Sequence, residues 1–230
     1  MLIIEIDGGF NFLNATSHLD KFNFSEPGMQ NLLGQLSVQR WDDHRLYHHS
    51  RINQSLHLVS ALAFIFSYVM LFINPVIASL VAWLVSMTTR QAGHFFFEPR
   101  GYDHVNKMTD AHKEEIKVGY NIQRKIVLMA LWISVPVLGY LYPSALSWAL
   151  PSDDQHDLIT LTAMWWLYLG VAGMLFRMLQ LWIQDGYVSA LAWGLKILSD
   201  PFHDVKLYYK APLRLMQGEL IDPMPHVHVK

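Results

Sequence analysis

The chain has 230 residues, of which 52% are hydrophobic and 16% charged, and its formal net charge is −2 at pH 7. Ordinary soluble domains carry about 25% charged residues, so this composition is unusually apolar. The absence of Cys excludes disulfides, zinc ribbons and thiolate-bound iron–sulfur clusters. No block of Lys and Arg indicates a nucleic-acid partner. A bound metal would therefore use His, carboxylate, carbonyl or water ligands.

The first 40 residues contain scattered aromatics among Gly, Asn, Ser and Pro, a mixture that predicts a partly ordered cytosolic extension. The opening apolar run is too short for the core of a secretory signal, so we expect no signal peptide. Residues 41–51 then predict an amphipathic lead-in to the first long apolar segment.

Long stretches without Lys, Arg, Asp or Glu dominate the middle of the chain: residues 52–89, 126–152 and 158–176. A membrane-crossing helix needs about 17 to 25 apolar residues, so the first stretch is long enough to cross twice. Asn74-Pro75 divides this stretch, because proline removes a backbone donor and restrains the residue before it. The predicted membrane-spanning helices lie near residues 55–73, 76–97, 125–142 and 158–177.

Basic residues indicate how these helices are oriented. They cluster before the first predicted helix, between the second and third, and after the fourth, whereas the other two connections contain none. The positive-inside rule therefore places both termini in the cytoplasm, which requires an even number of crossings. Residues 178–198 are apolar but carry Asp185-Gly186, and they predict an interfacial or cytosolic helix rather than a fifth crossing.

The expected fold is an all-α integral membrane bundle of about four transmembrane helices, in the bacterial inner membrane or the endoplasmic reticulum. Residues 201–230 contain four prolines and predict an extended cytosolic tail. The expected organisation is thus an extension over residues 1–40, a membrane-embedded metal-binding domain over 41–200, and a tail over 201–230. The lipid bilayer is the expected partner, and the oligomeric state stays open.

Histidines are concentrated near the predicted hairpin, since seven of the twelve fall between His44 and His112. Residues four apart share one face of a helix, so His49, Asn53 and His57 should form one stripe. His94 and Glu98 should form a second stripe by the same spacing. At 1.5 Å per residue, His57 and His94 both lie roughly 26 to 28 Å from the hairpin turn, on the cytoplasmic side.

Polar groups in membrane helices are costly and usually mark a functional interior, so this convergence favours metal binding over a purely structural polar network. Imidazole and carboxylate ligands without sulfur suit Fe(II), Zn or Mn, and the composition does not select among them. The pattern His44-x-x-x-His48-His49 is also typical of membrane di-iron hydroxylases and desaturases, although a solvated helix face explains it equally well.

Two motifs carry a family resemblance. Residues 47–57 read YHHSRINQSLH, and residues 93–100, after the apolar hairpin, read GHFFFEPR. The segment of about residues 45–100 resembles the 2-hydroxy-fatty-acid dioxygenase family, whose small multi-pass membrane proteins carry YHHxxxNxxxH and GHxxFExR motifs in this order.

The resemblance implies an Fe(II)-dependent enzyme of fatty-acid α-oxidation, which uses O₂ to cleave the C1–C2 bond of a 2-hydroxy fatty acid and shortens it by one carbon. The substrate's hydroxyl and carboxylate would then chelate the iron. Motif positions imply an iron-binding set and a supporting set, which are His48, His49, His57 and His94, and Asn53, Glu98 and Arg100.

The supporting residues have specific expected roles. Arg100 could pair with the substrate carboxylate, or simply flank the membrane as a basic residue. Glu98 could ligate iron or orient His94, and Asn53 is expected to orient a histidine. Residues 101–124 form a polar insertion where the family continues with Arg-Pro-Ala-Leu. Its His104 and His112 are further candidate metal ligands.

Other functions stay open on the sequence. A di-iron lipid hydroxylase or desaturase could draw ligands from His44, His48, His49, His57, His94, His104, His112 and His203, and it would hold two irons per chain. A b-type haem protein or metal carrier could use His57 and His94 as axial ligands. A membrane scaffold without metal would tolerate alanine at either position.

Overall fold

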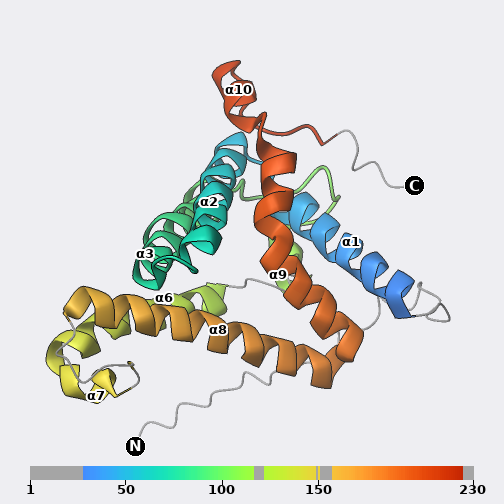
Figure 1. Ribbon diagram of the computed structural model, residues 1–230. Helices are drawn as coiled ribbons and strands as arrows, with labels where there is room; N and C mark the ends of the chain where they lie inside the picture. Colours follow the sequence, from blue (N-terminus) through green and yellow to red (C-terminus); the bar gives the residue numbers. More distant parts are fainter. Residues whose placement is uncertain (1–27, 117–121, 149, 151–156, 225–230) are drawn as a thin grey trace, which may run out of the picture.

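The computed structural model describes residues 28–116, 122–148, 150 and 157–224. This part of the chain is helical, with two isolated β-bridges and no strand (Figure 1). The prediction of an all-α fold is therefore confirmed. Most of the predicted N-terminal extension lies outside the described residues.

The first helix already belongs to the bundle. Helix α1 spans Gly28–Tyr47, so the expected boundary after residue 40 falls inside it. Residues 48–50 are not helical, and helix α2 spans Arg51–Met70. Ser50 caps α2, because its extended backbone lets its side chain accept a hydrogen bond from the Asn53 N–H. The link of residues 48–50 thus separates the two helices.

The predicted break at Asn74-Pro75 is confirmed. Asn74 accepts a hydrogen bond from the Ile77 N–H, and Pro75 occupies the first turn of α3. The hairpin segment of residues 75–97 consists of α3 (Pro75–Leu80), the π-helical η2 (Val81–Met87), α4 (Thr88–Ala92) and the π-helical η3 (Gly93–Phe97). Short π-helical stretches are rare and frequently lie at functional sites.

The second half of the chain begins with three helices after the hairpin: α5 (Asp110–Ile116), α6 (Ile122–Leu141) and α7 (Pro143–Ser147). It ends with three more: α8 (Leu158–Asp185), α9 (Tyr187–Tyr208) and α10 (Ala211–Met216). Gly186 separates α8 from α9 with a φ of 88°, a conformation that suits glycine.

The prediction of an extended tail from residue 201 is wrong. Helix α9 continues through Pro201, which is buried, and the expected domain boundary after residue 200 lies within this helix. Packing of α9 against α1, α2 and α8 overrides the local effect of the proline.

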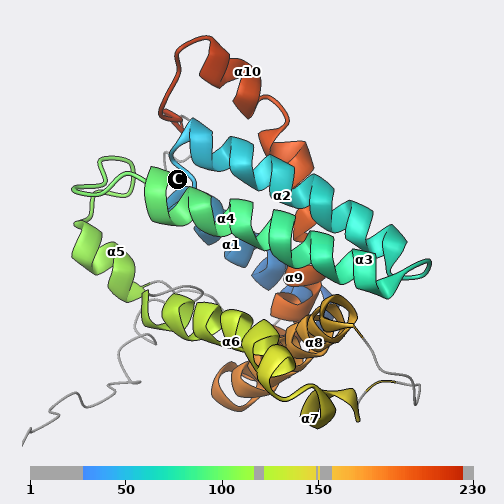
Figure 2. The same ribbon diagram turned by 90° about the vertical axis from the view of Figure 1, so that its left-hand side faces the viewer.

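Helices α1, α2, α9 and the hairpin segment form the body of the molecule; α8 lies below it near the hairpin turn, and α6 lies beside residues 83–96 of the hairpin segment (Figures 1 and 2). Helix α8 packs on α3, α6 and α9. At the end of the body away from the hairpin turn, the link of residues 48–50, η3 and the end of α9 lie together.

Two helices in the described part, α2 and α8, are long and apolar enough to cross a membrane. Helix α2 also has an inverted polarity. Its buried face carries Asn53, His57 and Ser60, and its exposed residues include Leu62 and Phe66. A soluble amphipathic helix shows the opposite arrangement, so α2 suits an apolar solvent outside and a polar interior.

Candidate metal centre

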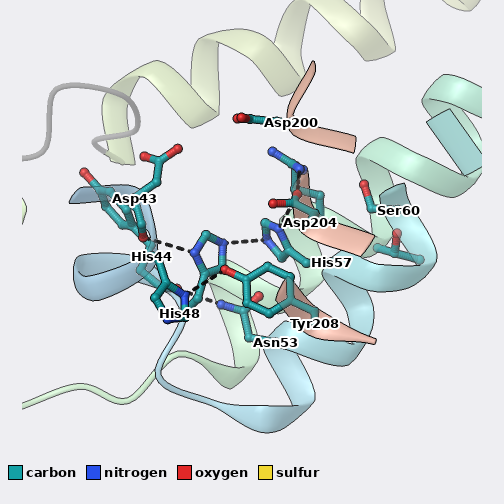
Figure 3. A network of polar contacts seen from close by, with 12 residues as sticks. Asp43, His44, His48, Asn53, His57, Ser60, Asp200, Asp204 and Tyr208 are labelled. Atoms are coloured by element: carbon teal, nitrogen blue, oxygen red, sulfur yellow. Dashed lines mark hydrogen bonds and ion pairs between the residues drawn. The ribbon is translucent and has the colours of Figure 1, made fainter. Parts of the chain in front are cut away.

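Three histidines from the two motifs, residues 47–57 and 93–100, lie close together. His48 comes from the link after α1, His57 from α2 and His94 from η3. The Nε2 atom of His57 lies 3.2 Å from that of His48 and 3.1 Å from that of His94. We call these three residues the histidine cluster; Figure 3 shows His48 and His57 facing each other within it.

Hydrogen bonds alone do not explain the cluster. An imidazole nitrogen carries either one hydrogen or one lone pair, so His57 Nε2 can donate once or accept once, and it has two such neighbours. One cation shared by three lone pairs removes this conflict. Metal–nitrogen bonds of about 2.0–2.1 Å place neighbouring ligand nitrogens about 3 Å apart. The donor set therefore fits a metal ion.

The surroundings of His48 and His57 differ. His48 Nδ1 lies 3.0 Å from the Asp43 carbonyl oxygen, which can only accept, so Nδ1 carries the proton and Nε2 keeps its lone pair. The Nδ1 atom of His57 is buried without a hydrogen bond to the described residues, and the Asp204 carboxylate lies beside it, with Oδ2 3.8 Å away. Arg90 fixes this carboxylate by donating to it over 2.5 Å.

The electrostatic environment keeps His48 neutral. Burial lowers the pKa of His48 well below 6.5, and the neighbouring imidazoles of His57 and His44 and the Arg90 guanidinium lower it further. Neutral imidazole is the form that binds metals, so His48 is in its ligand form at neutral pH.

A polar stripe on α9 surrounds the cluster. Lys196, Asp200, Asp204 and Tyr208 follow one another at intervals of four residues, and all four are buried. The sequence pattern did not single them out, because residues 178–198 were expected to form a peripheral helix and residues 201–230 an extended tail. Their four-residue spacing in an apolar segment is the signal that could have found them.

Ion pairs from the buried Lys196 and Asp200 join this stripe to α1. Lys196 Nζ contacts Asp43 and lies 2.9 Å from Asp200 Oδ2, and Arg40 Nε lies 3.3 Å from Asp200 Oδ1. Burial lowers the pKa of Lys196, but the carboxylates of Asp43 and Asp200 outweigh it, so the net pKa is raised. The pairs hold the backbone of Asp43, which in turn orients His48.

Tyr208 closes the cluster on the α9 side (Figure 3). Its side chain is fully buried, and its ring centroid lies 5.5 Å from that of His48. Burial raises the pKa of Tyr208 well above 10, and the nearby Asp204 and Asp43 add to this, so the phenol stays protonated. Its hydroxyl lies 3.1 Å from His44 Nδ1, at hydrogen-bond distance. A cavity of about 20 Å³ beside His48 and Tyr208 has room for about one water molecule.

His49 does not share a stripe with Asn53 and His57, so that prediction is wrong. The helix is interrupted between them, and His49 turns toward the insertion. Its Nε2 donates to the Arg45 carbonyl over 2.7 Å and lies 3.2 Å from Asp103 Oδ2. His49 therefore anchors the loop after η3 and lies outside the histidine cluster.

Glu98 and Asn53 connect the two motifs. The Glu98 carboxylate accepts hydrogen bonds from the His49 N–H over 2.9 Å and from the Asn53 amide. Asn53 also donates to the Tyr47 carbonyl over 2.8 Å. Glu98 has an extended backbone beyond η3 and is not a member of the cluster. These contacts tie the link that carries His48 to the helix end that carries His94.

The remaining predicted site residues lie away from the cluster. Arg100, His104 and His112 are exposed, and the guanidinium of Arg100 lies 3.5 Å from the Phe95 carbonyl. His104 packs edge-on against Tyr102. The structure does not bring His104 or His112 to the histidine cluster: Asp103 docks the insertion against His49, and both imidazoles are exposed.

Comparison of the chain with family models, curated proteins and solved structures found no match. The likeness to the 2-hydroxy-fatty-acid dioxygenase family consequently rests on the two motifs within residues 45–100.

Proposed function

We propose that this chain is a membrane-embedded Fe(II)-dependent dioxygenase that cleaves the C1–C2 bond of 2-hydroxy fatty acids. The observation that carries the proposal is the meeting of three Nε2 atoms, from His48, His57 and His94. All three belong to the motifs that resemble the dioxygenase family. A ferrous ion on three imidazoles would keep positions open for O₂ and for a chelating substrate.

The chain's own residues have supporting roles in this proposal. The Asp43 carbonyl orients His48, and the Asp204 carboxylate places a negative charge beside His57. Tyr208 restricts water beside the ligands, because its buried ring occupies that side of the cluster. Arg90 lies one helical turn before His94, and its guanidinium donates to Asp204 beside the cluster.

Competing metal sites fit the geometry less well. Within the described residues only three histidines converge, and His104 and His112 face outward, which favours one iron over two. The 3.1 Å between His57 Nε2 and His94 Nε2 is too short for axial haem ligands, which would need about 4 Å at bond lengths near 2.0 Å.

We also propose four membrane crossings, by α2, residues 75–97, α6 and α8, with the histidine cluster on the cytoplasmic side. The chain has no Cys, so single cysteines can report the topology. An impermeant maleimide should label Ile73→Cys, at the exposed hairpin turn, in sealed right-side-out vesicles. Gln217→Cys after α10 should react only after permeabilisation. The reverse pattern would contradict this orientation.

Oxygen uptake tests the activity. The protein is purified anaerobically in detergent, loaded with Fe(II), and supplied with 2-hydroxyhexadecanoic acid or with hexadecanoic acid. We expect uptake with the hydroxylated acid alone, and a product acid that is one carbon shorter. A folded, iron-loaded protein that consumes no oxygen with either acid would contradict the proposal.

A further inference from the structure

The segment after α10, residues 219–224, pairs with the link between α1 and α2. The two form an isolated antiparallel β-bridge. The Arg51 N–H donates to the Leu220 carbonyl over 2.9 Å, and the Asp222 N–H donates to the His49 carbonyl over 2.7 Å. Backbone hydrogen bonds therefore join the end of the described chain to the short link that carries one of the three cluster histidines.

One carboxylate and one apolar side chain fix this segment in place. The carboxylate of Asp222 accepts hydrogen bonds from Arg51 Nη1 over 2.7 Å and from Gln54 Nε2 over 2.8 Å. It also accepts one from the Met224 N–H over 3.0 Å, and the Met224 side chain is completely buried. These contacts hold the segment against the first turn of α2.

Gln54 connects this segment to His48. The Gln54 Nε2 atom donates to the Asp222 carboxylate and also to the His48 carbonyl, over 2.8 Å in both cases. Both amide hydrogens are thus used, and the Gln54 oxygen accepts a hydrogen bond from Arg51 over 2.7 Å. The Gln54 side chain is 1% exposed, so bulk water does not compete for these bonds. The Asp222 carboxylate therefore fixes the amide that holds the His48 backbone.

His48 depends on such contacts more than the other two cluster histidines do. His57 and His94 belong to helical segments, whereas His48 follows the last residue of α1. The His48 ring is oriented by the Asp43 carbonyl, and the His48 carbonyl is held by Gln54. Displacement of the segment after α10 would therefore loosen the backbone on the C-terminal side of His48.

We infer that the segment after α10 is a positioning element for the ligand His48, so that docking of this segment and metal binding by the histidine cluster stabilise each other. By linkage, a docked segment that raises the metal affinity by a given factor is itself held more tightly, by the same factor, when the metal binds. Groups that orient metal ligands typically contribute about 10- to 100-fold in metal affinity. The inference rests on the proposed metal site but not on the proposed reaction.

Hydrogen exchange of the full-length protein in detergent tests the coupling. The probe is Co(II), which is stable in air, binds imidazole nitrogen and shows visible absorption bands that depend on its ligands. We expect Co(II) to slow amide exchange in residues 219–224 more than in residues 161–166, which are part of α8. No slowing, or equal slowing of both segments, would overturn the inference, because the metal would then act at most through the stability of the whole fold.

Variants at the two connecting side chains test the positioning. Gln54→Met removes the amide that holds the His48 carbonyl, and Asp222→Ala removes the carboxylate that anchors this amide. Each should weaken Co(II) binding about 10- to 100-fold and change the Co(II) absorption bands. Ser79→Ala in α3 is the matched control, since it also removes a buried hydrogen bond, to the Ala163 carbonyl.

The outcomes separate this inference from the metal site itself. If the unchanged chain binds Co(II) and both variants bind it as tightly as Ser79→Ala does, the inference is overturned while the metal site stands. If the unchanged chain binds no Co(II), both are overturned. Weaker binding in the two variants at equal helicity, with unaltered binding in Ser79→Ala, would support the inference whether or not the chain consumes oxygen.

Discussion

His57 and His94 are 37 residues apart in the chain, yet their Nε2 atoms lie 3.1 Å apart. Hairpin geometry produces this contact, because α2 and the hairpin segment return from the Asn74-Pro75 turn over nearly equal lengths. His48 completes the cluster from a non-helical link.

Removal of a cluster histidine should abolish metal binding. His57→Ala and His94→Ala each delete one of three ligands, and we expect the affinity for Fe(II) to fall by more than about a hundredfold, beyond the loss typical for outer residues. Metal content after dialysis measures this. His112→Ala is the matched control, because His112 is exposed outside the cluster. Equal metal loss in all three variants would contradict the site.

The crossing of α2 and η3 should depend on Gly93. A Cβ at this position would lie 2.0 Å from Asn53 Oδ1, so Gly93→Ala must displace the asparagine or part the helices. We expect a loss of about 1–3 kcal/mol in stability and weaker metal binding. Thermal unfolding checks this against Gly34→Ala in α1, where a Cβ meets nothing within 4 Å. If both variants unfold at the same temperature, the close approach has no role.

Lys196 should stabilise the junction of α1 and α9. Lys196→Met leaves the part-exposed Asp43 without its ammonium partner and the buried Asp200 with Arg40 alone. Loss of one partner in a fully buried ion pair costs about 3–5 kcal/mol, so we expect a smaller loss of stability here. The unfolding midpoint should fall, and His48 should lose part of its orientation. Lys206→Met on the same helix removes an exposed charge and should change little. A midpoint unaffected by Lys196→Met would contradict this role.

The segment after α10, residues 219–224, should detach from α2 at acid pH. Burial raises the pKa of Asp222, but hydrogen bonds from Gln54 and the Met224 N–H and the charge of Arg51 outweigh it, so the pKa is lowered from 3.8. Because the pKa is lower in the folded chain, the ionised carboxylate stabilises the fold at any pH above the pKa that Asp222 has in the unfolded chain. This stabilisation is lost as the pH falls through the lower, folded pKa.

Asp222→Asn should therefore expose residues 219–224 to faster hydrogen exchange at pH 7, and its difference from the unchanged chain should shrink as the pH falls below 3.8. Gln54 also donates to the His48 carbonyl, so this contact links the segment to the cluster. A difference that grows on acidification would have the wrong sign.

The sequence could predict the part of the site that regular helices determine. The Asn74-Pro75 turn and the helical rise were enough to bring His57 and His94 to one depth. The sequence could not predict where the His49 side chain points, because its direction depends on the non-helical backbone of residues 48–50. The same holds for Glu98, whose extended backbone after η3 turns it to the His49 N–H.

Tertiary packing determined the rest. Pro201 indicated the end of a helix, but burial of α9 against α1 and α2 carries the helix through it. The polar stripe from Lys196 to Tyr208 was visible as a four-residue repeat, although only its contact with α1 gives it a role. The outward direction of His104 likewise depends on where Asp103 docks.

Iron stoichiometry after anaerobic loading and desalting is the most direct test of the metal centre. We predict one Fe(II) per chain, and none in a variant with alanine at His48, His57 and His94. Two irons per chain would instead support a di-iron enzyme that recruits histidines beyond the cluster. No retained metal in a folded chain would show that the three imidazoles form a structural polar network.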